Sequence, residues 1–276
     1  MLRPAFRLPV LGILVAAYIL GGFIAGFAPG RRRRWKVRAA WTRLLSRAAL
    51  GLLGIHVVHC PASRKAPGGT GLLNVANHLS YLDILILSSL RPSLFVTSRE
   101  VGRDPLLGGL ARLGGSLFVE RRSPSGLKAE IGALTRSLQE GARVVLFPEA
   151  TSGNGDAPLP FRSALLQAAL DAGTPVLGTC LCYIGVDERA FGPRVRDRVC
   201  YHGDHRFLPH LMGLLSLRRV DVVAMDLPAV IPYPGLSRRD LADALHRRIS
   251  RLYESLAMTS GGDPAAAGDR ALEGAF

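Results

Sequence analysis

The sequence predicts an α/β fold: a mixed, mostly parallel central sheet with helices on both faces, preceded by an N-terminal membrane-associated helical segment. Three observations support this prediction. Short, continuously apolar runs bounded by turn residues are typical of strands that are covered on both faces. These runs alternate with segments of helical length, as in α/β domains. A long uncharged apolar stretch lies near the N-terminus and is followed by a cluster of arginines.

The N-terminal stretch VLGILVAAYILGGFIAGFAPG begins at Val10 and carries no charge before Arg31. At about 1.5 Å per helical residue it is long enough to cross a bilayer core of about 30 Å, although it could also only dip into the membrane. A cleaved signal peptide is the alternative, because Arg3 and Arg7 resemble its basic start. The arginine cluster at 31–34 stands where a cleavage site is expected, which favours an uncleaved segment. Because this cluster outweighs the two preceding arginines, the rest of the chain is expected on the cytoplasmic face of the inner membrane.

A second stretch, residues 39–58, mixes apolar residues with arginines, and Trp35 and Trp41 lie near its start. This pattern predicts a helix lying in the lipid headgroup region, and the alternative is an amphipathic helix packed on the core. A loop rich in Pro, Gly, Lys and Arg at 61–71 then marks a boundary. We therefore expect membrane-anchoring helices at 1–60, an α/β domain at 61–257 and a disordered tail at 258–276, which lacks periodicity.

The α/β domain contains alternating strand and helix patterns. Strands are predicted at 72–77, 93–98, 116–120, 143–149, 175–184, 198–202 and 220–225. Helices are predicted at 80–90, 106–113, 126–140, 161–172, 208–217 and 238–256. This order predicts a sheet with helices on both faces.

The chain is strongly basic, with a formal net charge of +14 that arginine carries almost entirely. Such a charge can reflect an anionic lipid surface, a nucleic acid partner, or an arginine-rich coding bias. The basic residues are scattered, and no nucleic-acid recognition motif accompanies them, so a nucleic acid partner is not expected. The hydrophobic content of 48% and the apolar N-terminus favour contact with membrane lipids.

The cysteines form no CxxC pair and no short disulfide framework; they are Cys60, Cys180, Cys182 and Cys200. The last three could be combined with His202 and His205 into a zinc cluster. However, the CxC pair lies on a predicted strand and the onward spacing is irregular, which favours reduced, buried thiols in a cytosol-facing domain. No metal ion is expected.

The stretch NVANHLSYLD, residues 74–83, ends an apolar run on His78 and places Asp83 five residues later. On one regular helix these two side chains would not face each other. They can meet if His78 lies in the turn after a strand and Asp83 lies in the first turn of the next helix. The simpler interpretation is that Ser80 and Asp83 only cap this helix. The functional interpretation is an imidazole held in one tautomer by a carboxylate, with its other nitrogen able to accept a proton.

Two more polar residues follow predicted strands. Arg121 comes after the strand in GGSLFVERRS, and Glu149 ends the strand in VVLFPEATSGNG. Ligands of α/β sheets bind at the carboxyl ends of the strands, so these residues are candidates for the same site as His78.

These residues together resemble the motifs of the glycerolipid acyltransferase family of the lysophosphatidic acid type. Asn77, His78 and Asp83 match its NHxxxxD motif. The second motif, Gly-x-x-Phe-x-x-Arg, is matched by Gly115, Phe118 and Arg121. The third, Phe-Pro-Glu-Gly-Thr, is matched by Phe147, Pro148, Glu149 and Thr151. The motifs are in the family's order and extend, with their surroundings, from about residue 72 to residue 184.

The sequence departs from the family pattern at three places. Ala150 replaces the glycine of the third motif, and Ser152 stands where many members have an arginine. The fourth motif is only half present, with Pro175 but with Gly178 in place of its second proline. The continuation to LPFRSAL is similar to a subgroup that also contains acyltransferases acting on lyso-ornithine lipid. The segment YHGDHRFLPHL resembles one that recurs in this subgroup, where a pocket wall is the expected role.

The resemblance implies a transfer of a fatty acyl chain from acyl-CoA or acyl-carrier protein to a lysolipid hydroxyl. It implies His78 as the general base and Asp83 as the carboxylate that orients it. Arg121 is implied in binding the acceptor's phosphate, while Glu149 and Thr151 shape the acceptor pocket. An ion pair with a nearby arginine is the alternative for Glu149. The neighbouring motif positions Asn77 and Ser152 complete the expected substrate-binding set.

The acceptor expected first is 1-acyl-sn-glycerol-3-phosphate, in phospholipid biosynthesis, and lyso-ornithine lipid is the alternative. The expected partners are membrane lipids, the lysolipid acceptor and the acyl donor, and no cofactor is implied. A non-catalytic lipid-binding membrane protein remains the alternative from another class, because the third motif is altered and the chain is basic and apolar.

Overall fold

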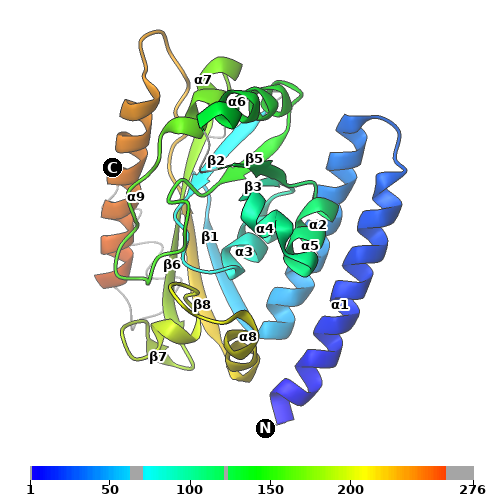
Figure 1. Ribbon diagram of the computed structural model, residues 1–276. Coiled ribbons are helices and arrows are strands. Elements are labelled where there is room, and N and C mark those ends of the chain that lie inside the picture. Colours follow the sequence, from blue (N-terminus) through cyan, green and yellow to red (C-terminus); the bar gives the residue numbers. More distant parts are fainter. Residues whose placement is uncertain (1, 63–70, 121–123, 259–276) are drawn as a thin grey trace.

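The computed structural model describes residues 2–62, 71–120 and 124–258 of the chain (Figure 1). The predicted disordered tail, apart from Met258, lies outside the described residues, as does most of the predicted loop at 61–71.

The described strands form one mixed sheet. Their bounds are β1 Ile55–Cys60, β2 Leu72–Ala76, β3 Leu94–Ser98, β4 Leu117–Val119, β5 Arg143–Leu146, β6 Val176–Val186, β7 Arg189–Ala190 and β8 Val220–Asp226. The strand order is β1-β8-β6-β2-β5-β3-β4, and β7 forms an antiparallel pair with the end of β6. Only β8 and β6 pair antiparallel along this order, and the other neighbours are parallel. The predicted mixed, mostly parallel sheet is confirmed.

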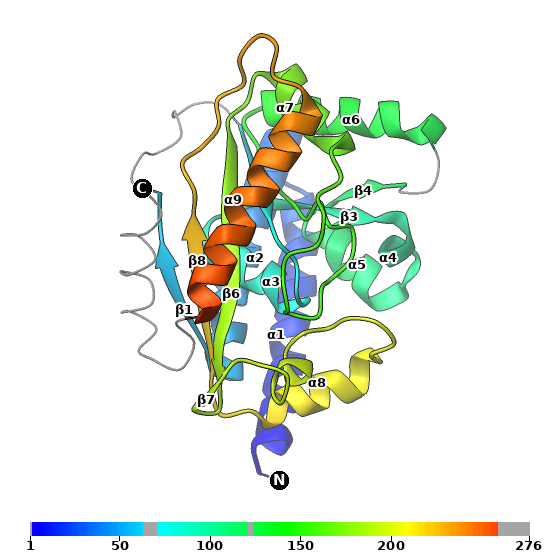
Figure 2. The same ribbon diagram turned by 90° about the vertical axis from the view of Figure 1, so that its left-hand side faces the viewer.

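Helices cover both faces of the sheet. Their bounds are α1 Leu2–Gly26, α2 Arg31–Leu53, α3 Leu82–Leu90, α4 Arg99–Arg103, α5 Pro105–Leu113, α6 Pro124–Gln139, α7 Gln167–Ala172, α8 Phe207–Ser216 and α9 Arg238–Met258, with 3-10 turns at η1 Ala164–Leu166 and η2 Arg196–Arg198. Helix α9 crosses one face, while α2 and α3 lie on the opposite face (Figures 1 and 2). This arrangement confirms the predicted fold class, because central strands such as β2 are buried along their whole length.

Helix α1 packs lengthwise beside α2 (Figure 1). The indole nitrogen of Trp41 donates to the carbonyl of Ala17 at 3.3 Å, and the Tyr18 hydroxyl donates to the carbonyl of Leu110 at 3.2 Å. Within the described chain, the stretch Arg3–Gly26 is the one helical segment whose length and apolar composition would suit a membrane crossing; signal sequences share these properties. Only 11% of its apolar window is buried in the protein, so most of the helix surface is free to contact an apolar environment outside the protein.

The second N-terminal stretch differs from its prediction. Helix α2 begins at Arg31 and ends at Leu53, because Gly54 adopts a left-handed conformation with φ +72° that terminates the helix. The run after it forms β1, which pairs with β8, so the sheet begins before the expected boundary at residue 61. One face of α2 is buried and packs on α3, as in the alternative of an amphipathic core helix.

Other local predictions also need correction. Residues 198–202 form no strand; Arg198 ends the 3-10 turn η2, and residues 199–202 run as irregular chain towards α8. The predicted helix at 161–172 is helical only from Ala164 onwards. The short elements α4 and β7 were not predicted, since five-residue and two-residue segments are too short to show a period.

Candidate active site

Strand β2 delivers the site residues to the carboxyl edge of the sheet. Its next residue, Asn77, is fully buried and pairs its side-chain amide with the backbone of Leu181 on β6. The amide nitrogen donates to the Leu181 carbonyl at 2.9 Å, and the amide oxygen accepts from the Leu181 N–H at 2.8 Å. Asn77 therefore continues the pairing of β2 with β6 by one residue and fixes the start of the turn that carries His78. Asn77 thus lies inside the protein, where its side chain supports the backbone of this turn.

His78 and Asp83 meet in this turn. Nδ1 of His78 lies 2.9 Å from Oδ2 of Asp83, which is completely buried, whereas the His78 side chain is 20% exposed. The same carboxylate oxygen accepts the backbone N–H groups of Leu79 at 2.6 Å and Ser80 at 2.9 Å. Asp83 thus also holds the backbone of the turn that precedes α3, whereas the N-cap of the helix is Tyr81, with no side-chain cap hydrogen bond. The histidine-orienting contact is therefore present, and the predicted capping takes the form of hydrogen bonds to this turn. With a proton on Nδ1 facing the carboxylate, Nε2 is the ring nitrogen that can accept a proton.

Two aromatic residues complete this pair: Tyr183, which the sequence did not single out, and Phe147 of the third motif, for which it predicted no role. The Tyr183 hydroxyl donates to Oδ1 of Asp83 at 2.7 Å. Burial and the neighbouring carboxylate raise the pKa of Tyr183 well above its usual value, so the hydroxyl remains a donor. The His78 ring stacks on Phe147, with 4.1 Å between ring centroids and 15° between ring planes. Hydrogen bonds and stacking together hold the imidazole in one orientation.

Glu149 lies beside the same turn. Its Oε1 accepts the backbone N–H of His78 at 3.1 Å, and its Oε2 is buried with no hydrogen-bond partner in the described part of the chain. Burial raises the pKa of Glu149 to about 8, and the charge of Asp83 adds to this effect, while backbone N–H donors at His78 and Leu159 oppose it. The carboxyl is therefore mostly protonated at pH 7, and the structure shows no ion pair between it and a described arginine.

The raised pKa of Glu149 predicts a pH effect on stability. The folded state holds this proton up to about pH 8, whereas an unfolded glutamate loses it near pH 4.5. The free energy of unfolding should therefore fall as pH rises between these values, at up to about 1.4 kcal/mol for each pH unit. Glu149→Gln keeps a neutral side chain of the same shape, so its stability should change much less with pH. Urea unfolding of both proteins between pH 5 and pH 8 measures this difference, and parallel pH profiles would contradict the prediction.

Ala150 occupies a backbone position that suits glycine. Its φ is +63°, in the left-handed region, where a side chain costs about 1–2 kcal/mol. The family resemblance places a glycine here, and the backbone conformation explains why that motif favours one.

Ala150→Gly should therefore stabilise the protein. Relief of the left-handed strain is partly offset by the greater freedom of glycine in the unfolded chain, so we expect a gain of about 1 kcal/mol in the free energy of unfolding. Thermal and urea unfolding measure it. Ala169→Gly in α7, at a buried helical position, is the contrasting control and should destabilise.

Of the remaining predicted residues, the structure describes Thr151, Ser152 and Gly115. Thr151 is exposed, and the Ser152 hydroxyl donates to the carbonyl of Tyr201. Strand β4 ends at Val119, and Arg121 lies outside the described residues. Gly115 in the second motif has φ +80°, which glycine adopts without strain. The structure therefore brings together His78, Asp83 and Glu149.

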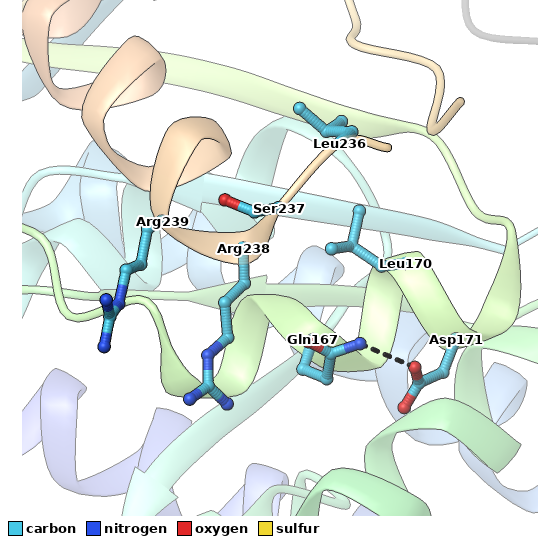
Figure 3. A pocket seen from close by; sticks show the side chains of 7 residues that line it. All are labelled: Gln167, Leu170, Asp171, Leu236, Ser237, Arg238 and Arg239. Atoms are coloured by element: carbon cyan, nitrogen blue, oxygen red, sulfur yellow. Dashed lines mark hydrogen bonds between the residues drawn. The ribbon is translucent and has the colours of Figure 1, made fainter. Parts of the chain in front are cut away.

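A hollow elsewhere on the protein is a separate feature. It is lined by residues of α7, of the start of α9 and of the segment before α9 (Figure 3): Gln167, Leu170, Asp171, Leu236, Ser237, Arg238 and Arg239. Gln167 donates to Asp171 across one turn of α7 at 2.7 Å. Because α7 leads into the start of β6, which is parallel to β2, this hollow lies towards the edge of the sheet opposite to His78.

In the described part of the chain, His78 belongs to no group of three or more potential metal ligands. The one such group among the described residues is formed by Asp197, His202 and His205. The arrangement at His78 is an imidazole, its buried carboxylate and an open ring nitrogen at the carboxyl edge of an α/β sheet. Such an arrangement is typical of enzymes that activate a hydroxyl by general-base catalysis.

Comparisons with known proteins specify this class further. The acyltransferase family model matches residues 57–181, which include His78, Asp83 and Glu149. The lyso-ornithine lipid O-acyltransferase of Rhizobium meliloti is 33% identical over 229 residues, or 80% of this chain and 75% of that protein. The 1-acyl-sn-glycerol-3-phosphate acyltransferase of Neisseria gonorrhoeae is 38% identical over 140 residues, or 50% of this chain and 54% of that protein.

A solved structure shares the fold. The crystal structure of the 1-acyl-sn-glycerophosphate acyltransferase PlsC from Thermotoga maritima superposes with a TM-score of 0.67 at 19% identity, covering 92% of this chain and 95% of that one. The chain belongs to the acyltransferase family. The family membership expected from its motifs is thereby confirmed.

Proposed function

We propose that the protein transfers a fatty acyl chain from a thioester donor, acyl-CoA or acyl-carrier protein, to the hydroxyl of a lysolipid. The observation that carries the proposal is the 2.9 Å contact between Nδ1 of His78 and Oδ2 of Asp83, which leaves Nε2 on a partly exposed ring. An alcohol is a poor nucleophile at neutral pH, so a positioned base contributes about 10²- to 10⁴-fold to the rate.

In the proposed reaction, Nε2 of His78 takes the hydroxyl proton as the lysolipid oxygen attacks the thioester carbonyl. The buried Asp83 stabilises the imidazolium that forms. Collapse of the tetrahedral intermediate breaks the carbon–sulfur bond, and the imidazolium returns its proton to the departing thiolate. The scheme uses no Ser or Cys nucleophile and no cofactor.

Glu149 is proposed to support the acceptor. Its Oε1 already holds the backbone of His78, and the neutral carboxyl can exchange hydrogen bonds with acceptor hydroxyls through Oε2. Arg121 and Thr151 keep their proposed roles at the acceptor headgroup. The Ser152 hydroxyl is engaged by the Tyr201 carbonyl, so its proposed contribution is to shape the pocket.

Two acceptors are candidates. Lysophosphatidate is the acceptor that the family motifs predict first. Lyso-ornithine lipid is favoured by the Rhizobium meliloti relative, whose similarity extends over 80% of this chain. Ser152 in place of an arginine also removes one cation that a phosphate acceptor would use.

Purified protein in lipid vesicles, supplied with acyl-CoA or acyl-carrier protein, tests both acceptors in parallel. Mass spectrometry of the lipid products should show one acylated lysolipid and release of the free thiol. Vesicle binding without product from either acceptor and either donor would instead support a non-catalytic lipid-binding protein.

We also propose that α1 anchors the protein in the inner membrane and that the α/β domain faces the cytoplasm. The apolar, largely exposed α1 and the arginines at 31–34 support this orientation. Protease digestion of inverted and right-side-out membrane vesicles distinguishes the two faces. The α/β domain should be cleaved only in inverted vesicles, and cleavage in right-side-out vesicles would contradict the orientation.

A further inference from the structure

Two histidines outside the catalytic turn are held side by side. His202 and His205 flank a tight turn in which the His205 N–H donates to the His202 carbonyl at 3.3 Å. Gly203 in this turn has φ +58°, a conformation that glycine adopts without strain. The two imidazole centroids are 4.7 Å apart, with 49° between the ring planes. The turn therefore directs both rings to the same region.

A carboxylate completes the group. Oδ1 of Asp197, from the 3-10 turn η2, lies 3.2 Å from Nε2 of His202. One ligand atom from each of Asp197, His202 and His205 lies within 4.8 Å of the others. Nδ1 of His205 is buried and has no hydrogen-bond partner within the described chain. A buried ring nitrogen without a partner is costly, which indicates that it binds something the protein itself does not supply.

The neighbouring side chains do not complete the group. Both ring nitrogens of His210 are engaged, Nδ1 with the Tyr81 hydroxyl at 3.0 Å and Nε2 with the Cys200 carbonyl at 3.1 Å. The Cys200 thiol is fully buried beside Gly155. Arg196 approaches Asp197 at 3.8 Å but also forms an ion pair with Asp156. The guanidinium therefore keeps an ionic partner if Asp197 turns away from it to bind another group.

We propose that Asp197, His202 and His205 bind a divalent transition-metal ion, with zinc as the expected ion. Two imidazoles and one carboxylate are a typical zinc set, with a fourth position for water, whereas calcium and magnesium prefer oxygen ligands. Tetrahedral bonds of 2.0–2.2 Å require ligand atoms about 3.3 Å apart. The ligand atoms of Asp197 and His202 already have this spacing. A side-chain rotation of His205 or of the exposed Asp197 brings the His205 nitrogen to the same distance from the other two ligand atoms.

The site adjoins the catalytic turn. Between the ligands and that turn, the Tyr201 N–H donates to the Leu79 carbonyl at 2.9 Å, and the Tyr201 carbonyl accepts from Ser152. A bound ion would cross-link η2 to the 202–205 turn and so fix Tyr201 against the residue that follows His78. The ion's role is thus structural: it stabilises the wall of the active site and takes no part in the proton transfer.

Metal binding can be measured independently of activity. Full-length protein in detergent is stripped with a chelator and then titrated with Zn²⁺ in competition with a chromophoric chelator. We expect one ion per chain, a zinc-dependent rise in Tm, and visible absorption of tetrahedral Co²⁺ when cobalt replaces zinc. Asp197→Asn combined with His205→Ala should lose all three signals, while circular dichroism without metal should match the wild type.

A matched control separates this site from surface histidines. His56 is exposed on β1, so His56→Ala should keep the stoichiometry, the Tm rise and the cobalt spectrum of the wild type. The proposal is overturned if the wild-type protein binds no Zn²⁺, or if Asp197→Asn/His205→Ala binds it with the same stoichiometry and affinity.

Discussion

His78→Ala is expected to lower the rate of acyl transfer by about 10²- to 10⁴-fold, the contribution of a positioned general base. The protein should remain folded, because the lost ring is partly exposed and its loss leaves Asp83 with three other donors. The measurement is the initial rate of acylated lysolipid formation in vesicles, with circular dichroism as the check of folding. A rate within a factor of three of wild type would remove His78 from the mechanism.

The chain offers a closely matched control for this substitution. His59 also pairs with a buried carboxylate, with Nε2 3.0 Å from Oδ2 of Asp226 and a side chain that is 24% exposed. However, Asp226 ends β8, which is separated from β2 by β6 in the sheet, and in the described part of the chain no hydrogen bond or ion pair joins this pair to His78 or Asp83. Arg91 and Thr179 also contact Asp226 and keep its charge compensated. His59→Ala should cost a similar amount of stability and leave acyl transfer close to wild type.

The sequence predicted those parts of the fold that have a local signal. Apolar runs such as 72–77 and 220–225 became buried strands because both faces of the sheet are covered. Strand β1 was missed because its residues continue the apolar pattern of α2, and only Gly54 separates the two. The run at 198–202 resembles a strand in composition, but its backbone bonds instead to the preceding turn and to Leu79.

The site was predictable where its residues are close in sequence. Five residues separate His78 from Asp83, and the turn chemistry between them can be inferred from that spacing. Tyr183 lies 100 residues from Asp83 inside an apolar strand, so only the parallel pairing of β6 with β2 reveals that its hydroxyl reaches the carboxylate. The supporting position of Asn77 has the same origin, since its partner is Leu181 on β6.

The buried carboxylate therefore has both a structural and a proposed catalytic task. Its two oxygens accept from the His78 ring, from two backbone N–H groups and from the Tyr183 hydroxyl. A charged acceptor strengthens each of these hydrogen bonds and compensates the cost of burying Asp83. The same charge is the feature that would stabilise an imidazolium at His78 during proton transfer.

Asp83→Asn should consequently also have a large effect on the rate, a loss of about 10³- to 10⁴-fold, similar to the loss when the acid of a serine-protease triad is replaced. The amide oxygen can still accept from the turn, and the amide nitrogen can donate to the Tyr183 oxygen, so the fold should survive with a stability lower by several kcal/mol. Rates are measured well below the Tm of the variant.

Tyr183→Phe is the milder variant for comparison, because it removes one hydrogen-bond donor to Asp83 and keeps the charge of the carboxylate. We therefore expect a loss of only about 1–2 kcal/mol in stability and a much smaller loss in rate. Equal rates for the two variants would show that the charge of Asp83 contributes nothing to catalysis beyond holding the turn.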